Sequence, residues 1–430
     1  MEEEEEEEED RVELGRPPLP RWIRFGALVL AVLAALALLA VHVWPGSGTS
    51  RPVTVPPSTP SAPTSVVSPE RSPATPTTTP WPTAPGACGS EPQLAIVSST
   101  PRTDRTGIRV LLGGDRLQVV NFDSGDAVAL NVAGLQPGEY AAVLAGAPAA
   151  YATTATCEAD RSKALRIGAD RRVSVVGSLG TTEAVLVGGD RAWVVSYPAG
   201  VKYPYGAVRS LGGNHRVRLP AGFYPYAAEG NTLVGVLQPD QSAPPIRLLL
   251  VDATTGRTLA GLGPGGQLVA TGGGQVAWTT GCDASRDGPC VLHSRRLSSG
   301  STTSYRLPRP ACCGGPGVIT ADGTLLAFLL ERATTDARYQ GHPTPPSDVA
   351  VLHLDTGRLE IVPGVEIPAK SSPGLAYSTD GRWLAIALDA GTHIRLLAWR
   401  SGLTHPHETN AIPGQVLGRP TIVMLPPPTQ

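Results

Sequence analysis

The sequence predicts an all-β fold, a β-propeller, for the region from Ala87 to Gln430. Apolar segments in this region are short, rich in Val and Leu, and separated by Gly, Asp and Pro, with no long helical period. A unit of strand, turn and strand also recurs there at intervals typical of propeller blades. A single apolar run and a proline-rich stretch precede this region, so we expect an extracytoplasmic propeller with an N-terminal membrane tether.

In each copy of the recurring unit, an apolar strand leads into a polar turn that contains a glycine. Asp or Ser side chains bond the turn backbone, and glycine adopts the positive φ that closes a hairpin. The longest interval, from Gly125 to Gly200, has room for one more unit with a turn near Gly168. The predicted turn glycines are Gly125, Gly200, Gly256, Gly300, Gly357 and Gly402.

Together with the additional turn, this repeat indicates a seven-bladed propeller. The 344 residues from Ala87 to Gln430 then give about 49 residues for each blade. Propeller repeats have a period of roughly 40 to 50 residues. Seven blades therefore fit best, and six or eight blades stay open.

A second motif precedes two of these hairpins near the C-terminus. It reads Thr320-Ala-Asp-Gly-Thr-Leu-Leu-Ala-Phe328 and Ser378-Thr-Asp-Gly-Arg-Trp-Leu-Ala-Ile386. The motif resembles the WD40-like repeat of TolB-type propellers, in which Ser-Pro-Asp-Gly-x-x-Leu-Ala-Phe links the innermost strand of a blade to the second. Ala321 and Thr379 replace the usual proline. The resemblance implies a propeller that binds other proteins, and it implies no catalytic residues.

The apolar run from Phe25 to Trp44 is predicted to cross the membrane. Its 20 residues include no Asp, Glu, Lys or Arg, and as a helix they span ~30 Å, the thickness of the hydrocarbon core. No small-x-small site ends the run, so residues 22–44 are interpreted as an uncleaved signal anchor. Basic residues are more frequent before the run than after it, where only Arg51 lies close. This asymmetry predicts a cytoplasmic N-terminus and a single-pass plasma-membrane protein. The basic residues before the run are Arg11, Arg16, Arg21 and Arg24.

The segments on either side of the predicted helix have low-complexity compositions. Residues 1–21 include nine consecutive carboxylates, Glu2 to Asp10, which repel one another, so we expect a disordered cytoplasmic tail. Residues 45–86 hold 12 prolines and 16 Ser or Thr and have no apolar period. We expect them to form a disordered linker that holds the β domain, residues 87–430, away from the membrane.

All six cysteines lie beyond the predicted helix, on the oxidising side of the membrane. This compartment favours disulfides, and no Cys-x2-Cys spacing indicates a zinc site. Cys282 and Cys290 flank a turn-rich loop between two strands, so they are a candidate hairpin disulfide. The other candidates are Cys88 with Cys157, which would tie the first blade to the second, and Cys312 and Cys313, either as a vicinal pair or with separate partners.

No motif names a reaction, a cofactor or a metal. Asp123-Ser-Gly125 and Asp355-Thr-Gly357 resemble the aspartic-protease motif, but both lie in the repeated turn, which explains them better. His405-Pro-His407-Glu408 is interpreted as a solvated turn rather than as metal ligands. The 35 basic and 37 acidic side chains nearly cancel, which argues against nucleic acid as a partner.

The best candidate for a binding surface is a group of tyrosines. Two Tyr-Pro-Tyr sequences, with Tyr197 and Phe223 close by, lie within thirty residues. Tyrosine has a rigid apolar face and a polar tip, which suits recognition of a protein or a sugar. Packing between blades is the alternative interpretation. The predicted binding residues are Tyr203, Tyr205, Tyr224 and Tyr226.

These observations favour a non-enzymatic function, a protein-binding scaffold or sensor in the cell envelope. Loops on a closed ring form a rigid platform with variable edges, which suits binding. Two alternatives stay open. One is a cell-wall glycan-binding module, which the linker and the tyrosines favour. The other is a propeller-type hydrolase or lyase, which needs carboxylates or histidines that converge on the central channel.

Overall fold

The structure of the protein is a computed structural model of the whole chain. The chain divides into two units, 1–48 and 49–430, and every described residue belongs to the second unit. The predicted acidic tail, the predicted membrane segment and nearly all of the predicted linker lie outside the described residues. Within the described residues, no helix is long and apolar enough to cross a membrane. The structure describes residues 50–52, 95–100, 105–132, 139–145, 149–155, 161–168, 170–180, 182–197, 205–237, 247–264, 266–282, 290–308, 313–331, 346–368, 371–416 and 419–426.

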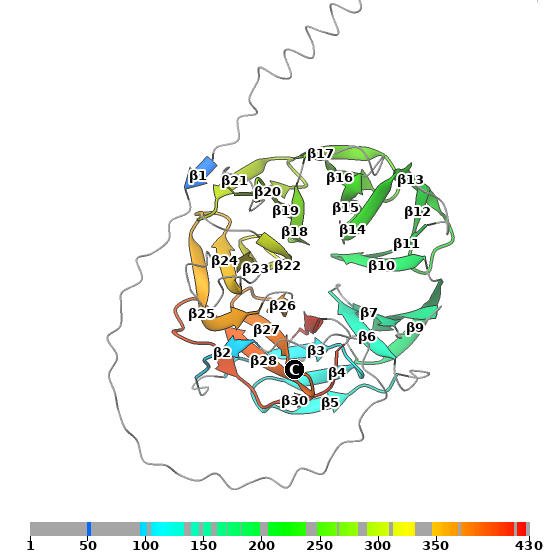
Figure 1. The fold of residues 1–430 in the computed structure, drawn as a ribbon. Coiled ribbons are helices and arrows are strands. Elements are labelled where there is room, and N and C mark those ends of the chain that lie inside the picture. Colours follow the sequence, from blue (N-terminus) through cyan, green and yellow to red (C-terminus); the bar gives the residue numbers. More distant parts are fainter. Residues whose placement is uncertain are drawn as a thin grey trace, which may run out of the picture. The chain divides into compact units, whose positions relative to one another are not determined.

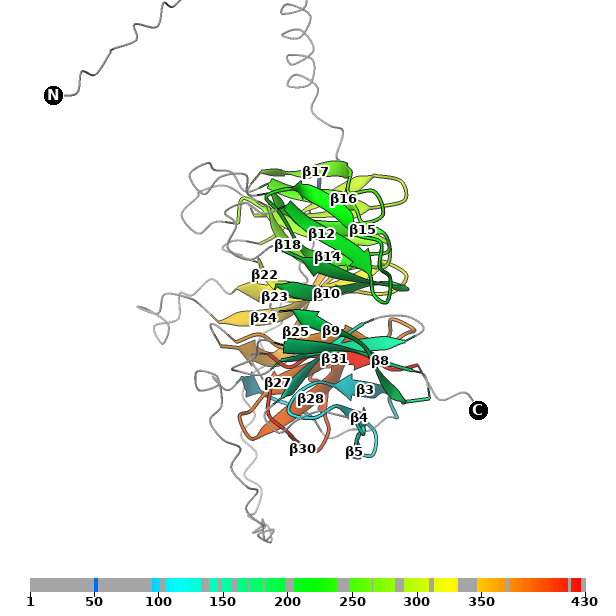
Figure 2. The same cartoon turned by 90° about the vertical axis from the view of Figure 1, so that its right-hand side faces the viewer.

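The described residues form seven sheets, which are arranged around a central axis as the blades of a ring (Figure 1). Figure 2 shows the same ring from the side. In each blade the strands follow one another from the axis to the outer edge, and neighbouring strands are antiparallel, apart from one short parallel strand at the outer edge of blade 5. The predicted seven-bladed β-propeller is therefore confirmed, and six or eight blades are excluded.

Blades 1 to 4 contain four strands each, in order from the axis outward. Blade 1 comprises β31 (Ile422–Met424), β3 (Arg109–Leu112), β4 (Gln118–Asn121) and β5 (Ala127–Ala129). Blade 2 comprises β6 (Tyr140–Leu144), β7 (Ala150–Ala155), β8 (Arg161–Ile167) and β9 (Val173–Gly180). Blade 3 comprises β10 (Glu183–Gly188), β11 (Arg191–Ser196), β12 (Tyr205–Ser210) and β13 (Val217–Ala221). Blade 4 comprises β14 (Phe223–Glu229), β15 (Thr232–Leu237), β16 (Arg247–Asp252) and β17 (Thr258–Pro264).

Blades 5 to 7 carry additional short strands. Blade 5 comprises β18 (Gln267–Gly272), β19 (Gln275–Thr280), β20 (Val291–Arg296) and β21 (Thr302–Arg306), with β1 (Ser50–Pro52) parallel to β21 at its outer edge. Blade 6 comprises β22 (Cys313–Ile319), β23 (Leu325–Glu331), β24 (Ser347–His353) and β25 (Leu359–Ile367), with β2 (Ile96–Val97) antiparallel to β25. Blade 7 comprises β26 (Gly374–Tyr377), β27 (Leu384–Asp389), β28 (His393–Trp399), and β29 (His407–Glu408) and β30 (Ile412–Pro413), which both pair with β28.

The last strand of the chain closes the ring. β31 pairs with β3, with Leu111 opposite Val423, and the Leu425 amide donates to the Arg109 carbonyl oxygen at 2.9 Å. The innermost strand of blade 1 thus comes from the C-terminal end of the propeller, and the other strands of this blade come from its beginning. Closure joins the first blade to the last and leaves no open end in the ring.

The apolar core is divided into seven clusters, each of which lies between two neighbouring blades. Side chains alternate along a strand, so one strand contributes to the clusters on both sides of its blade. In β23, Leu326 and Phe328 pack toward blade 5, whereas Ala327 and Leu329 pack toward blade 7. Because both faces of this blade are buried, β23 is apolar from Leu325 to Leu330 and does not alternate with polar residues.

The hairpins between third and fourth strands have a common hydrogen-bond pattern in blades 1, 4, 5 and 6. The amide of the turn glycine donates to the carbonyl oxygen of the residue four positions earlier. The amide of that earlier residue donates in turn to the carbonyl oxygen of the residue that follows the glycine. The glycines have φ between 69° and 75°, in the left-handed region. Asp123-Ser-Gly125 and Asp355-Thr-Gly357 therefore belong to turns of separate blades, as predicted. The four glycines are Gly125, Gly256, Gly300 and Gly357.

Two of the predicted hairpins differ from these four. The additional hairpin near Gly168 is present between β8 and β9, where Arg171 has a φ of 64°. Gly200 lies outside the described residues, and the sequence around it falls between β11 and β12, so it is not the turn between the third and fourth strands of blade 3. The corresponding hairpin of this blade joins β12 to β13 and contains Gly212, with a φ of 84°. A glycine-containing polar stretch looks the same in either connection, so the sequence alone could not distinguish the two.

The Thr-Ala-Asp-Gly and Ser-Thr-Asp-Gly motifs form the hairpins between the first and second strands of blades 6 and 7. Asp322 Oδ1 accepts hydrogen bonds from the Thr320 hydroxyl at 2.6 Å and the Thr324 amide at 3.0 Å. Asp380 Oδ1 likewise accepts from the Ser378 hydroxyl at 2.5 Å and the Arg382 amide at 3.1 Å. The predicted role of this motif as the link between the two innermost strands is therefore confirmed.

Candidate functional site

The two faces of the ring differ in the connections that they carry. At the face that we call the turn face, inner strands end in hairpins such as residues 230–231, and third strands end in the repeated glycine turns. At the opposite face, the loop face, second strands lead to third strands and each blade leads to the next. At this face β23 ends at Glu331 and β24 begins at Ser347. Variable loops on a rigid scaffold commonly carry function.

Two of the clustered tyrosines stack at the loop face, at the junction of blades 3 and 4. Tyr197 follows the end of β11, and Tyr224 is the second residue of β14. Their ring centroids are 5.4 Å apart and their planes make an angle of 25°. Tyr197 packs partly against the apolar cluster between blades 3 and 4, and Tyr224 packs partly against the cluster between blades 4 and 5. The stacked pair therefore contributes to the packing between blades.

A β-bulge exposes the third tyrosine of the group. In the ladder between β14 and β15, Pro225 pairs with Gly235 and Ala227 pairs with Val234, which leaves Tyr226 as the extra residue. A bulge of this kind can redirect a side chain. The Tyr226 side chain is 59% exposed, the highest value among the exposed large hydrophobic residues that the structure describes.

The hydroxyl groups of Tyr197 and Tyr226 are uncharged at neutral pH. Burial raises the pKa of Tyr197 well above its ordinary value, and the neighbouring Tyr224 and Tyr226 raise it further. Burial and then Tyr224 also raise the pKa of Tyr226. The Tyr197 hydroxyl is buried and has no hydrogen-bond partner within the described part of the chain. The cluster thus combines apolar ring faces with neutral polar groups.

The other two predicted binding residues cannot be placed in this cluster. Tyr203 lies outside the described residues. Tyr205 is the first residue of β12, opposite Ala221, and its side chain is not described. The structure therefore brings together Tyr197, Tyr224 and Tyr226, while the roles of Tyr203 and Tyr205 stay predictions.

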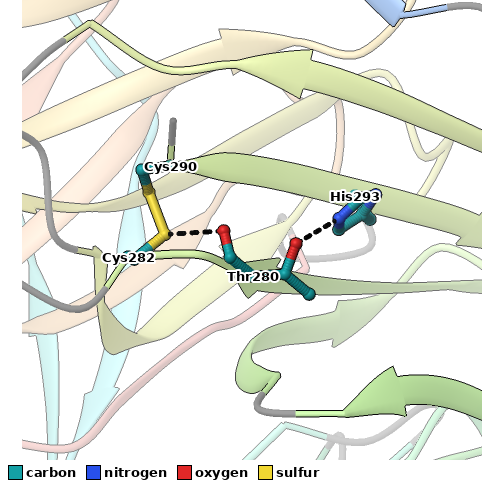
Figure 3. Close-up of a disulfide and its surroundings, with 4 residues drawn as sticks. All are labelled: Thr280, Cys282, Cys290 and His293. Atoms are coloured by element: carbon teal, nitrogen blue, oxygen red, sulfur yellow. Dashed lines mark hydrogen bonds between the residues drawn. A yellow bond between two sulfur atoms is a disulfide. The ribbon is translucent and has the colours of Figure 1, made fainter. Parts of the chain in front are cut away.

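The predicted disulfide between Cys282 and Cys290 is confirmed, and it closes the connection between β19 and β20 on the loop face (Figure 3). The Sγ atom of Cys282 lies 3.4 Å from the Thr280 carbonyl oxygen, and the Thr280 hydroxyl lies 2.8 Å from Nε2 of His293. The remaining cysteine pairings stay untested. Cys88, Cys157 and Cys312 lie outside the described residues, and Cys313 lies in β22 with an undescribed side chain.

The interpretation of His405 to Glu408 as a solvated turn is wrong. His407 and Glu408 form β29, and the His407 side chain is 3% exposed. The His407 ring packs 6.1 Å from the Trp383 ring, and Glu408 accepts two hydrogen bonds from Arg395 at 2.6 and 2.9 Å. In the region that the structure describes, no three His, Cys, Asp or Glu side chains are grouped as metal ligands.

A pocket of about 300 Å³ lies at the turn face between blades 6 and 7. His353 lines it from blade 6, and Tyr377, Arg382 and Arg400 line it from blade 7. None of these residues was predicted from the sequence as a site residue. The sequence held one signal for this site. Arg382 directly follows the Asp-Gly of the repeated motif in blade 7, whereas Thr324 occupies the same position of the motif in blade 6.

Comparisons with known proteins found solved structures that resemble this chain at low sequence identity, with TM-scores below 0.5. No family model matches the sequence, and no curated protein matches it. TolB from Acinetobacter baumannii is 16% identical, with a TM-score of 0.39 over 72% of this chain and 79% of TolB. Oligogalacturonate lyase from Vibrio parahaemolyticus is 9% identical, with a TM-score of 0.49 over 73% of this chain and 92% of the lyase. AztD from Citrobacter koseri is 13% identical, with a TM-score of 0.45 over 74% of this chain and 97% of AztD.

Proposed function

We propose that this protein is a membrane-tethered, extracytoplasmic β-propeller that binds another protein of the cell envelope through the tyrosine cluster on its loop face. The single observation that carries the proposal is the exposure of Tyr226 beside the stacked Tyr197 and Tyr224. Exposed aromatic side chains are commonly interaction sites, and tyrosine is enriched among the residues that dominate binding energy.

The arrangement of the cluster suits recognition of a protein surface. Tyr197 and Tyr224 are held by packing between blades, so they lose little side-chain entropy when a partner binds. Tyr226 projects from a bulge next to them and offers apolar area together with a hydroxyl group. A rigid base with one exposed aromatic anchor is the usual arrangement of a binding hot spot.

The membrane tether belongs to the same proposal and follows from sequence features alone. The uncharged run from Phe25 to Trp44 and the excess of arginines before it support a helix with a cytoplasmic N-terminus. The disulfide between Cys282 and Cys290 is consistent with an oxidising compartment for the propeller. Protease treatment of spheroplasts that express a C-terminally tagged protein tests the orientation, and a protected tag contradicts it.

The binding surface is tested by crosslinking in living cells. The full-length protein, tagged at its C-terminus, is crosslinked, and the captured proteins are quantified by mass spectrometry. Replacement of Tyr226 by Ala is expected to reduce capture of the partner about tenfold, because a tyrosine hot spot contributes more than about 1.4 kcal/mol. Leu259→Ala is the matched control, since Leu259 lies in β17 of the same blade and is 56% exposed.

The possible results separate the proposed functions. Capture of an envelope protein that is lost with Tyr226→Ala and kept with Leu259→Ala supports the proposal. Capture that is equal in both variants contradicts the tyrosine surface. Recovery of cell-wall fragments in place of a protein, lost with the same variant, supports the glycan-binding alternative.

A further inference from the structure

The pocket between blades 6 and 7 lies on the turn face, whereas the tyrosine cluster lies on the loop face, so the function proposed above does not involve it. Its blade-7 wall is built from both hairpins of that blade. Arg382 lies in the first hairpin, and Arg400 and Ser401 lie in the second. The propeller repeat thus places two guanidinium groups on the wall of one cavity.

The two arginines are held by different contacts. The guanidinium of Arg400 lies 5.1 Å from the centre of the Trp383 ring, and stacking on an aromatic ring restrains its plane. The backbone amide of Arg382 donates to Asp380 Oδ1, which fixes the turn on which this side chain stands. No hydrogen bond of the Arg382 guanidinium is seen in the part of the chain that the structure describes, and its positive charge contributes to lowering the pKa of Asp380.

A nearby carboxylate is already engaged with other groups. Glu360 Oε1 lies 2.7 Å from Nε2 of His353 and also contacts the Arg358 guanidinium. The Ser401 hydroxyl lies 2.9 and 2.8 Å from the two Glu360 oxygens. Glu360 therefore contacts His353, Arg358 and Ser401. Among the described lining residues, the permanently charged groups are Arg382 and Arg400, and none is acidic.

The pocket also contains a hydroxyl group without a partner. Tyr377 lines the cavity, and its hydroxyl is buried with no hydrogen-bond acceptor in the described part of the protein. Burial and then the charge of Glu360 raise its pKa, so the group stays protonated. A buried donor without an acceptor is costly. An oxygen atom of a bound ligand supplies the hydrogen-bond acceptor that the Tyr377 hydroxyl lacks.

The remaining wall restricts the chemistry of a ligand. Leu325, Val351, Leu384 and Trp399 make the wall more apolar than polar, which favours a ligand with an apolar part. Arginine pairs well with planar oxyanions because its guanidinium can donate two parallel hydrogen bonds. A phosphate ester carries about −1.5 to −2 charges at neutral pH and is repelled more strongly by Glu360 and Asp380 than a carboxylate with a single charge.

We propose that this pocket binds a carboxylate attached to an apolar group, with the carboxylate on Arg382 and Arg400 and the apolar group against Trp399. A volume of about 300 Å³ is at the lower end of the range for ligand pockets, so it holds a small acid or the carboxylate end of a peptide. The proposal is independent of the protein-binding function proposed above, because the two sites lie on opposite faces.

Titration calorimetry on the full-length protein in detergent tests the proposal with four probes. N-acetyl-L-phenylalanine carries a carboxylate at a peptide end, phenylacetate is a small free acid, N-acetyl-L-phenylalanine amide has no charge, and phenyl phosphate carries the other oxyanion. At least one carboxylate is expected to bind at least about tenfold more tightly than the amide and than phenyl phosphate. The tighter of the two carboxylates identifies the source, a peptide end or a free acid.

Substitutions locate the binding and provide a control. Arg382→Gln is expected to weaken carboxylate binding about tenfold or more and to leave the thermal unfolding midpoint unchanged, because the side chain is exposed. Arg191→Gln is the matched control, since Arg191 follows an aspartate in the first hairpin of blade 3 and pairs with Asp190 at 3.7 Å. Equal binding of the amide, tighter binding of phenyl phosphate, or an equal effect of both substitutions overturns the proposal.

Discussion

The junction between blades 5 and 6 and the junction between blades 2 and 3 have the same strand topology but very different cores. Fifteen buried residues form the apolar cluster between blades 5 and 6, and they include Tyr305 and Phe328. Four buried residues form the cluster between blades 2 and 3 in the region that the structure describes: Ala164, Leu179, Val185 and Val194.

The strands themselves account for this difference. β23 of blade 6 is almost entirely apolar and buried, whereas most residues of β9 in blade 2 are partly or fully exposed. Hydrophobic stabilisation is roughly proportional to the apolar area removed from water. The backbone repeat therefore builds a uniform ring, while the side chains make its cohesion uneven. We expect the ring to open locally between blades 2 and 3 before it opens between blades 5 and 6.

The largest expected effect is on the strong junction. Phe328→Ala removes a fully buried ring from the cluster between blades 5 and 6, and it is expected to lower the free energy of unfolding by about 3 to 5 kcal/mol. Urea denaturation followed by tryptophan fluorescence measures this change. A cost below about 1 kcal/mol shows that the cluster contributes little cohesion and removes the basis of the comparison.

The disulfide at the edge of the same junction gives the next largest effect. Cys290 belongs to the cluster between blades 5 and 6, and Cys282 packs against it. The double substitution to Ser is expected to lower the free energy of unfolding by about 2 to 3 kcal/mol, which is the value for a short closed loop. Reduction of the natural protein with dithiothreitol is the control and is expected to produce a loss at least as large. Unchanged stability in both experiments contradicts a structural role for this bond.

A smaller effect is expected at the weak junction. Leu179→Ala removes one of the few buried side chains between blades 2 and 3, and a loss of about 2 kcal/mol is expected, since the exposed surroundings can relax. Val175→Thr in the same strand is the control, because Val175 is 52% exposed, and it is expected to stay within about 0.5 kcal/mol. A Leu179→Ala cost as large as that of Phe328→Ala shows that the two junctions are equally cohesive.

The smallest effect concerns acid sensitivity of the hairpins. The hydrogen bond from Thr320, followed by those from Thr324, lowers the pKa of Asp322 below its ordinary value against the opposing effect of burial. The charged carboxylate therefore stabilises the fold above its unfolded-state pKa of about 3.9, and this contribution is lost as the pH falls through the lower folded-state pKa. Asp322→Asn is expected to reduce the loss of stability between pH 6 and pH 3, by less than about 1 kcal/mol.

Asp190→Asn is the matched control for this measurement. Asp190 lies in the first hairpin of blade 3 and contacts Arg191 at 3.7 Å, with no hydrogen bond from its turn in the described residues. Its replacement tests whether the loss of any hairpin carboxylate alters the pH dependence of unfolding. If both substitutions change the acid sensitivity equally, the hydrogen bonds of the Asp322 turn are not its cause.

Features that depend on a few neighbouring residues were predicted correctly from the sequence. The glycine turns at Gly125, Gly256 and Gly357 follow from local hydrogen bonds and from the positive φ that glycine tolerates. The Cys282–Cys290 disulfide follows from two strands joined by a short loop. The seven-bladed fold follows from the period of these units. The turns and the disulfide depend on residues within one hairpin, and the number of blades depends on the spacing of these units along the chain, so the sequence by itself determined them.

Other features were decided only by the tertiary structure. β31 closes blade 1 by pairing with β3 from the opposite end of the propeller, and three residues carry no signal for a partner so far away in sequence. The splitting of the tyrosine group into a stacked pair and the exposed Tyr226 depends on a bulge and on packing between blades. The pocket with Arg382 and Arg400 exists because two hairpins of one blade meet a neighbouring blade. Side chains from separate hairpins become neighbours only when strands pair and blades pack together, and this long-range geometry is not encoded in any local pattern.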